Sequence, residues 1–431
     1  MRSDQQQAIN RLAGTSATAF LCAVLCVYPL YIDKFSNLGV TKFTGCFTLF
    51  LLFLLWLVAC TAIGARAPRP RNANAGRDVT LWGVLAFAGT SLISTFTSLS
   101  PTASTWGLGG YYGGLMLVLF TAAGYWAVRS YLDLENLDFV FWVLGITTSI
   151  VAVLYVLNIF NIDLIGAYAD TAVVERAQFF STLGQKDFNG CFFSVALPIV
   201  FYQFLNAKDT RTAVWTGIPA AFGALALAVV DSEALALGIG AAVMVLVCHK
   251  NFTTRHLRRA ALISAAFFGW AAWMHYMRAS VYTQGGTALL AKLGAWQVAL
   301  PCMAASLLLW LVLFVLARKG IAAQAPLYLP GRGITIAVLA VGALAFVLAN
   351  AMPNLPLPES LHNLLVFNDD WGTYRGVAWR AAFGTWADGS LLRKIVGIGP
   401  GMMHTAVAAW AGDAMTARMA TFYARSEEHT S

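Results

Sequence analysis

Charged side chains are scarce in this sequence. Asp, Glu, Lys and Arg make up 11% of its 431 residues, whereas 59% of the residues are hydrophobic. An ordinary soluble domain has roughly 25% charged residues, and a water-soluble globule needs a far more polar surface than this chain can offer. The scarcity of charge therefore excludes a soluble enzyme, a nucleic-acid-binding domain and a disordered chain.

Cysteines with the spacing of metal ligands are also missing. All seven cysteines lie inside apolar stretches, where a buried thiol behaves as a small hydrophobic side chain. The sequence therefore predicts neither a disulfide nor a metal site.

Long apolar blocks dominate the chain instead. Blocks of about 18–23 residues are long enough to cross a hydrocarbon core of roughly 30 Å as helices. We predict an all-α, polytopic integral membrane protein with about 11 transmembrane helices and a long outer-face loop. The expected spans are 15–32, 43–65, 79–98, 111–130, 139–160, 188–206, 213–230, 234–248, 260–277, 294–316 and 333–350.

Lys and Arg set the expected orientation of these spans. With the N-terminus in the cytoplasm, 16 of them fall on the cytoplasmic side and 6 fall in the short outer loops. Cytoplasmic loops of membrane proteins carry the excess of positive charge, so the basic loops are interpreted first as topology signals. Residues 1–350 are then the transmembrane domain, and 351–424 are a large extracytoplasmic loop.

The outer loop before the predicted span 188–206 is rich in polar residues. Arg176, Lys186, Asp187 and Asn189 lie close together in it and lead into a helix start. Asp187 or Asn189 is expected to cap that helix, and the positive end of the helix dipole favours a nearby anion. A polar loop that does no more than cap a helix is the alternative.

A second polar group lies in the large outer loop. A helix over Arg375–Phe383 would put Arg375 and Trp379 on one face, with Arg380 beside them. A guanidinium next to a flat aromatic ring at the membrane surface suits a phosphate or pyrophosphate headgroup. The glycines of 397–401 allow a tight turn. An interfacial amphipathic helix is the alternative.

An acidic turn, Asp231-Ser232-Glu233, separates the spans 213–230 and 234–248. Two helices of that length bring the turn to the outer face or just below it. A carboxylate at that depth is costly, which makes Asp231 a candidate functional residue. A solvated turn is the alternative.

Together these segments resemble the O-antigen ligase family of membrane glycosyltransferases. The resemblance covers the chain roughly from Thr80 to Gly401. Its landmarks, in order, are the segment 99–114 with Trp106-Gly107 and Tyr111-Tyr112-Gly113-Gly114, the stretch Phe180–Gly184, Asp231-Ser232 before Leu237-Gly238, and Arg375-x-x-x-Trp379 followed by Gly397-Ile398-Gly399-Pro400-Gly401.

The resemblance implies that a glycan is transferred or polymerised from an undecaprenyl-pyrophosphate donor. The acceptor would be a glycan, lipid or protein at the outer face of the bacterial cytoplasmic membrane, with no cofactor and no nucleic acid involved. It implies Arg176 and Arg375, together with Lys186, as ligands of the lipid pyrophosphate, and Asp231 and Arg380 as further candidates.

No catalytic residue is assigned from the resemblance. The family has a histidine motif after the glycine triplet, and His404 lacks that context. The motif is expected beyond Ala424, because the last residues, 425–431, read like a translated sequencing adaptor. We therefore expect 425–431 to be adaptor-derived and the chain to be an incomplete piece of an enzyme.

Two other functions remain open. A transporter or permease for a small solute also fits about eleven spans with glycine-rich helices, and a non-catalytic assembly or anchoring protein fits a chain without an assigned base. Transporters usually place charged residues near the membrane midplane. In this sequence the ligand-like groups gather at the outer face instead, which favours glycan transfer.

Overall fold

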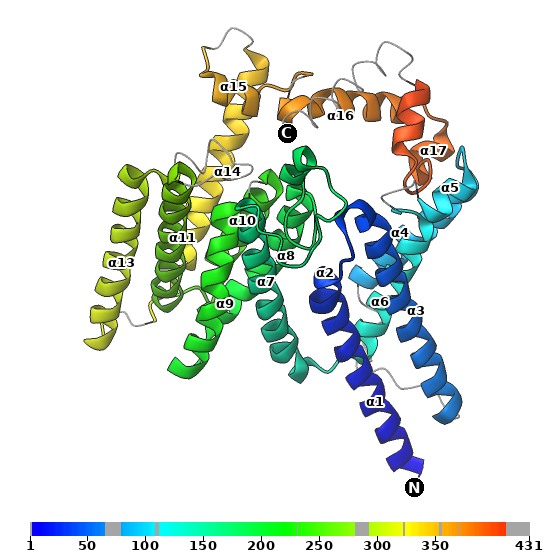
Figure 1. The fold of residues 1–431 in the computed structure, drawn as a ribbon, viewed down its shortest axis with the longest axis horizontal. Helices are drawn as coiled ribbons and strands as arrows, with labels where there is room; N and C mark the ends of the chain where they lie inside the picture. The colour runs from blue at the N-terminus through cyan, green and yellow to red at the C-terminus, as the bar shows by residue number, and fades with distance from the viewer. Residues whose placement is uncertain are drawn as a thin grey trace. The chain divides into compact units, whose positions relative to one another are not determined.

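The structure is a computed structural model. It describes residues 2–64, 79–107, 112–230, 232–280, 293–321, 324–352, 356–369 and 371–410. These residues form helices, turns and loops without a β-strand, which confirms the predicted all-α fold (Figure 1). The segment 425–431 and the candidate Asp231 lie outside the described residues.

The helices follow one another along the whole described chain. In order they are α1 (Arg2–Cys22), α2 (Tyr28–Leu30), α3 (Leu38–Gly64), α4 (Val79–Phe96), α5 (Pro101–Trp106), α6 (Leu115–Tyr131), α7 (Leu137–Ile159), α8 (Lys186–Asn206), α9 (Thr210–Val229), α10 (Glu233–Cys248), α11 (Thr254–Ser280), α13 (Trp296–Arg318), α14 (Tyr328–Ala351), α15 (Glu359–Leu365), α16 (Trp371–Ala387) and α17 (Leu391–Val396).

Eight described helical segments are long and apolar enough to cross a membrane. They are Gln6–Leu30, Phe35–Cys60, Val79–Phe96, Leu134–Ile159, Lys186–Asn206, Thr210–Val229, Trp296–Arg318 and Tyr328–Ala351. Large apolar side chains on them face outward, such as Leu308 at 61% and Ile336 at 67% exposure. An outer surface of this kind suits lipid and not water, so the chain is a multi-pass membrane protein.

The other three predicted spans are helical too, but two of them are shorter than the eight and the third is more polar. Helix α6 has 17 residues and α10 has 16, so each rises only about 24–26 Å. Helix α11 has 27 residues but carries arginines near both ends and several polar aromatic residues in its second half. The predicted number of eleven spans is therefore not confirmed beyond these eight.

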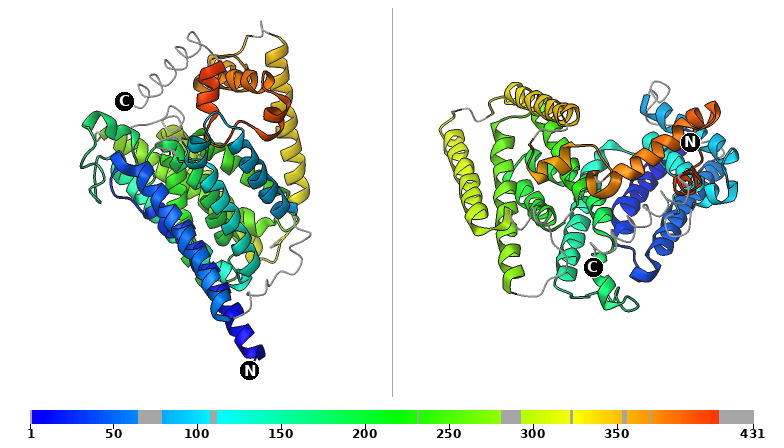
Figure 2. Two further views of the ribbon diagram at one scale, coloured as in Figure 1. Left: turned by 90° about the vertical axis from the view of Figure 1, so that its right-hand side faces the viewer. Right: turned by 90° about the horizontal axis from the view of Figure 1, so that it is seen from above.

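The chain forms two compact units. Among the described residues, unit 1 combines those up to Leu21 and those of Gly39–Leu134 with residues 339–410, and unit 2 combines Cys22–Leu38 with Glu135–Val338. In unit 2, α11 packs between α9 and α13, and the three helices lie side by side in both Figure 1 and the view from above in Figure 2.

The core of unit 2 is apolar and tightly packed. Phe193 and Leu197 of α8 are fully buried among Val151 and Tyr155 of α7 and Leu225 of α9. Few charges interrupt this core, so close packing of side chains holds the helices together, as it does in other membrane bundles.

Small residues let α8 and α10 approach closely at two positions. A Cβ atom on Gly238 of α10 would lie 3.2 Å from the Cα atom of Ser194 on α8, and closer still to its Cβ atom. Gly190 of α8 is covered in the same way by Ser232, which immediately precedes α10. This seam of small residues is typical of helix packing in membranes.

The connections of unit 2 gather at the two ends of its helices as the topology predicts. At one end, Thr254 N–H donates to Ala325 O at 3.1 Å and Arg259 Nη1 donates to Leu205 O at 2.8 Å. These bonds tie the first turns of α11 to the end of α8 and to the α13–α14 connection, all on the predicted cytoplasmic side. At the other end, the start of α8 meets the α9–α10 hairpin.

In unit 1, α4 packs against α6, and aromatic side chains join α1 to α3. Phe20 of α1 stacks on Phe53 of α3 at 4.1 Å between ring centroids and meets Phe50 edge-on at 5.0 Å. Helices α15, α16 and α17 fill much of the segment predicted as an outer-face loop, and α17 packs against α4.

Gly238→Ala tests the seam between α8 and α10. The added methyl group must displace Ser194, so we expect the free energy of unfolding to fall by about 1–3 kcal/mol. Gly240→Ala is the matched control, since nothing lies within 4 Å of its Cβ position, and it should leave stability unchanged or raise it by up to about 1 kcal/mol. Chemical denaturation in detergent micelles measures the free energy of unfolding of both variants. Equal values would show that the packing of α8 against α10 does not depend on the close approach at Gly238.

Candidate functional site

A closed turn forms the centre of the loop between α7 and α8. Phe180 N–H donates to Gly184 O at 2.9 Å, and Gly184 N–H donates back to Phe180 O at 3.1 Å. Ser181 has a φ of 56° and Gly184 a φ of 83°, and the N–H of Ser181 donates to Asn158 Oδ1 at 2.6 Å. The stretch singled out by the resemblance is therefore a defined turn pinned to the end of α7.

The side chain of Asn189 binds this turn through several hydrogen bonds. Its side chain is fully buried, and its Nδ2 donates to the carbonyls of Phe180 at 3.2 Å, Gly184 at 2.9 Å and Gln185 at 3.2 Å. Its Oδ1 accepts from Ser181 Oγ at 2.6 Å. Asn189 thus adds a second hydrogen bond to three carbonyls that already accept a backbone N–H, and it satisfies the buried hydroxyl of Ser181.

The predicted helix cap by Asp187 or Asn189 is therefore wrong. Gln185 is the N-cap of α8, and no side chain bonds the first free N–H groups there. Asn189 donates its amide to the preceding turn, and Asp187 Oδ1 accepts from Ser232 Oγ at 3.0 Å. The bond from Ser232, together with the contact of Ser232 on Gly190, joins the α9–α10 hairpin to the start of α8.

Tyr168 anchors the first half of the same loop. Its hydroxyl donates to Phe179 O, its ring lies 4.8 Å from that of Phe35, and the side chain is almost fully buried. The carboxylate of Asp163 accepts the N–H groups of Ala167 and Tyr168, both at 2.9 Å. Burial, assisted by the charge of Asp163, raises the pKa of Tyr168, so its hydroxyl stays a proton donor.

Arg176 lies on this anchored loop, in the 3₁₀ helix Val173–Gln178. Its guanidinium carbon is 5.4 Å from the ring centroid of Tyr168. Arg176 Nε is buried, and within the described part of the chain it has no hydrogen-bond partner; the same holds for Thr171 Oγ1. A buried donor without an acceptor is costly, and an anionic ligand would supply the acceptor.

Two cations outside this loop, Lys34 between α2 and α3 and Lys186 in α8, are placed differently. Lys34 Nζ pairs with Asp170 Oδ2 at 2.7 Å, and that hydrogen bond and the charge of Asp170 raise the pKa of Lys34. Lys186 is the first residue of α8 and is partly buried. Arg176 and Lys186 thus stand on either side of the Phe180–Gly184 turn.

In unit 1, the glycine triplet packs on the segment after α4. Gly397, Gly399 and Gly401 have φ values of 90°, 102° and 72°. A Cβ atom on Gly399 would lie 2.5 Å from Ser104 Oγ and 3.0 Å from Ser98 Oγ. Two further segments named for the resemblance, 99–114 and 397–401, therefore lie in direct contact.

The predicted helix over Arg375–Phe383 is confirmed as part of α16. Trp379 is 51% exposed, and the side chain of Arg375 lies outside the described part of the structure. Arg380 Nη2 forms an ion pair with Asp369 Oδ1 at 3.1 Å, a local partner that the sequence did not suggest. His404 is exposed in the last described helical stretch.

The structure thus assigns the candidate residues to both units. Arg176 and Lys186 belong to unit 2, whereas Arg375 and Arg380 belong to unit 1, so the meeting of Arg176 and Arg375 stays a prediction. Sequence reasoning missed Asn158 and the role of Asn189. The signal for Asn158 was an amide side chain in the last turn of an apolar span, where a polar group needs a partner.

Asn189→Ala should loosen the turn. It leaves Ser181 Oγ without its acceptor and removes a second donor from three carbonyls that each keep one backbone N–H, so we expect the free energy of unfolding to fall by about 1–3 kcal/mol. Gln203→Ala is the control on the same helix, because among the described residues Gln203 makes a single weak bond, to Asp138 O at 3.4 Å. Thermal and chemical unfolding in detergent measure both variants, and a loss for Gln203→Ala as large as for Asn189→Ala would contradict this role.

Gly399→Ala and Gly397→Ala separate backbone strain from the contact with Ser104. Both positions have positive φ, but nothing lies within 4 Å of the Cβ position of Gly397. Gly397→Ala should cost about 1 kcal/mol, and Gly399→Ala about 1–3 kcal/mol more. Unfolding measurements that give the two variants the same stability would show that 397–401 does not depend on the contact with Ser104.

The chain was compared with family models, with curated proteins and with solved structures. None of the three comparisons gives a match. A function for this chain therefore has to be argued from its own residues and from the contacts between them.

Proposed function

We propose that this chain is a membrane glycosyltransferase similar to O-antigen ligases. It transfers or polymerises a glycan from a polyprenyl-pyrophosphate donor to a glycan, lipid or protein acceptor at the outer face of the bacterial cytoplasmic membrane. One observation carries the proposal: in each unit, a segment behind the resemblance lies against a segment that is distant in sequence. The start of α8 meets Ser232 in unit 2, and 397–401 meets Ser98 and Ser104 in unit 1.

The proposed reaction requires the protein above all to stabilise the negative charge of the leaving pyrophosphate. The bond between the anomeric carbon and the diphosphate oxygen breaks, a bond from that carbon to an acceptor hydroxyl oxygen forms, and the hydroxyl proton is released. The bonding electrons stay on the polyprenyl pyrophosphate, whose negative charge grows as it leaves. A fixed cation at that point lowers the barrier.

Arg176 has the properties that this task needs. Its guanidinium is held against the Tyr168 ring, and its buried Nε has no acceptor in the described part of the chain. A guanidinium donates paired hydrogen bonds that match phosphate oxygens. Lys186, at the start of α8, adds charge beside the same turn, and Arg375 is the proposed second guanidinium.

Arg176→Gln should lower glycan transfer about 100-fold or more, because it removes a charged donor to the leaving group. Arg375→Ala should cause a loss of the same order. The assay follows transfer from a polyprenyl-pyrophosphate-linked glycan by the full-length protein in liposomes. Lys34→Gln is the matched control, since it removes an outer-loop charge that is exposed and paired with Asp170, and it should keep nearly full activity.

The same preparations distinguish the rival functions. Unchanged transfer by Arg176→Gln would remove Arg176 from the mechanism. Uptake of a small solute driven by an ion gradient, without glycan transfer, would favour a permease. Neither activity in the wild-type protein would favour an assembly or anchoring role.

A further inference from the structure

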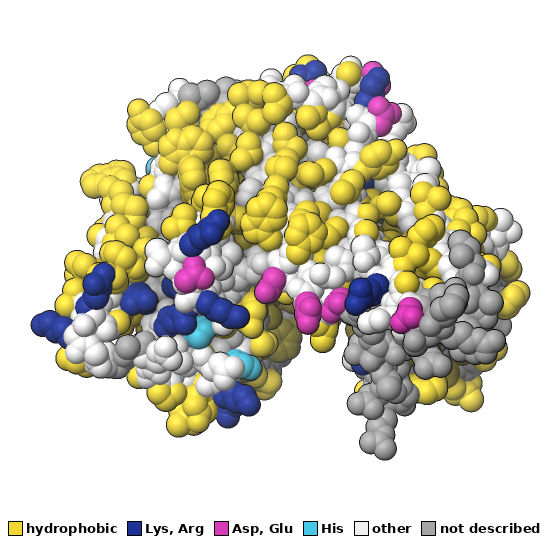
Figure 3. All heavy atoms as spheres, turned by 90° about the horizontal axis from the view of Figure 1, so that it is seen from below, with side chains coloured by type: hydrophobic (Ala, Val, Ile, Leu, Met, Phe, Trp, Pro, Cys, Tyr) yellow, Lys and Arg dark blue, Asp and Glu magenta, His cyan; other side chains and the backbone are white. Residues whose placement is uncertain are grey.

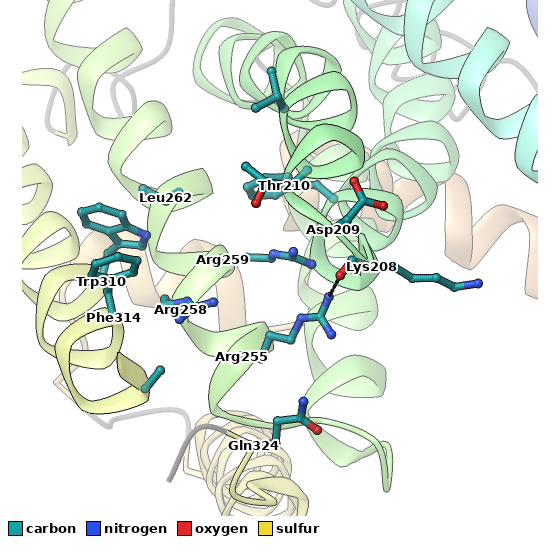
Figure 4. A pocket seen from close by; sticks show the side chains of 14 residues that line it. Lys208, Asp209, Thr210, Arg255, Arg258, Arg259, Leu262, Trp310, Phe314 and Gln324 are labelled. Carbon is teal, nitrogen blue, oxygen red and sulfur yellow. Dashed lines mark hydrogen bonds between the residues drawn. The ribbon is translucent and has the colours of Figure 1, made fainter. Parts of the chain in front are cut away.

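A cavity of about 730 Å³ opens at the end of unit 2 opposite the candidate site. It lies where α8 ends, where α9 and α11 begin and where α13 ends. Its cationic lining consists of Lys208, Arg255, Arg258 and Arg259, and Trp310 and Phe314 of α13 form an aromatic wall on one side (Figure 4). Figure 3 shows Lys, Arg and His side chains gathered on the face of the molecule seen from this end.

The local sequence explains why three guanidinium groups meet here. Arg255, Arg258 and Arg259 follow the helix start at Thr254 with spacings of three and four residues, which place them on one face of the first turns of α11. The N-terminal end of a helix carries partial positive charge, so cations are unfavourable there and anions are favourable. The arrangement concentrates positive charge where the helix itself adds more.

Two of these arginines are held in place by neutral groups. Arg259 Nη1 donates to Leu205 O at 2.8 Å, and Arg255 Nη2 donates to Ala207 O and, at 3.4 Å, to Lys208 O. These carbonyls belong to the end of α8 and the turn after it, and they do not cancel the positive charge. Burial and the neighbouring Arg255 and Arg258 accordingly lower the pKa of Arg259 to about 10.

The carboxylate of the cavity is already engaged. Asp209 Oδ1 accepts from Thr212 N–H and Asp209 Oδ2 accepts from Thr212 Oγ, both at 2.8 Å. Asp209 is thus the N-cap of α9, and these hydrogen bonds lower its pKa. Its negative charge remains, but the cavity lining still carries four cationic side chains against this one carboxylate.

Arg258 is the guanidinium that is available for a ligand. Its contact among the described residues is with the ring of Phe314, whose centroid is 5.8 Å from Arg258 Cζ. The aromatic face positions the flat guanidinium without using its N–H groups. Arg258 can therefore donate a pair of hydrogen bonds into the cavity.

We propose that this cavity binds a phosphate group through Arg258, with Arg255 and Arg259 supplying further positive charge. The phosphate comes from the headgroup of an anionic phospholipid in the adjacent leaflet or from free phosphate. The aromatic wall and the exposed apolar face of α13, with Leu308 at 61% and Leu311 at 48% exposure, suit the acyl chains of a lipid. Basic pockets between membrane helices on the cytoplasmic side are known to hold such headgroups.

The site does not depend on glycan transfer. The residues that form it lie in the connections predicted to be cytoplasmic, at the other end of the helices from Arg176. A basic residue that serves only to orient the chain needs neither a cavity nor an aromatic support, and Arg258 has both.

The test uses the full-length protein in a neutral detergent. Its thermal unfolding midpoint is measured during titration with phosphatidylglycerol, with phosphatidylcholine and with inorganic phosphate. Phosphatidylglycerol should raise the midpoint of the wild-type protein, because a ligand of the folded state stabilises it. Phosphatidylcholine should act much more weakly, since its choline cation is repelled by the arginines.

Arg258→Gln should weaken the apparent affinity for phosphatidylglycerol at least about tenfold, the loss expected for a charge-assisted hydrogen-bonding group. Arg211→Gln is the matched control: Arg211 is exposed in the first turn of α9 and does not line the cavity. It should retain the wild-type response. The midpoint of Arg258→Gln without ligand should equal that of the wild-type protein, because Arg258 donates no hydrogen bond within the described residues.

The outcomes decide both the site and the source of the phosphate. A shift with phosphatidylglycerol alone that depends on Arg258 identifies a lipid headgroup, and an equal shift with inorganic phosphate identifies free phosphate. The proposal is overturned if no ligand shifts the midpoint, if both lipids act alike, or if Arg258→Gln and Arg211→Gln respond in the same way.

Discussion

Polar groups buried in apolar surroundings need hydrogen-bond partners, and this constraint shapes the end of unit 2 that carries Arg176. Phe180 and Gly184 accept each other's N–H, and the buried amide of Asn189 adds a second donor to both carbonyls and to that of Gln185. Asn158 binds the same turn from α7. The loop that carries Arg176 leads directly into this turn, so two buried asparagines fix the part of the chain from which the proposed site is built.

Several arginines of this protein lie over aromatic rings. With 28 Lys and Arg residues against 20 Asp and Glu residues, at least eight cations have no carboxylate of their own. An aromatic ring supports a guanidinium without occupying its N–H groups. The pairs are Arg176 with Tyr168, Arg258 with Phe314, Arg259 with Phe204, Arg318 with Phe314 and Arg332 with Tyr328. The proposed site around Arg176 and the proposed phosphate site at Arg258 therefore share one feature, a guanidinium supported by an aromatic ring.

Glycine and serine provide the close approaches that bring distant segments together. Gly238 and Gly190 admit serines between α8 and α10, and Gly399 admits Ser98 and Ser104 in unit 1. In unit 1, the contact of Gly399 with Ser104 joins two segments of the resemblance to O-antigen ligases. In unit 2, the contacts join Ser232 and Gly238 to α8. Small residues are needed at these positions because the backbones approach one another there.

The sequence by itself determined the class of the protein and most of its membrane spans, because a long apolar run has few ways to satisfy its backbone other than a helix across the bilayer. It also predicted the helix around Arg375. It did not predict which partner a short polar side chain would choose, since that depends on residues far away in the chain. Asn189 therefore binds a turn instead of capping α8, and Arg380 pairs with Asp369. The basic cavity could be found only in the tertiary structure, because it forms where the end of α8, the starts of α9 and α11 and the end of α13 meet.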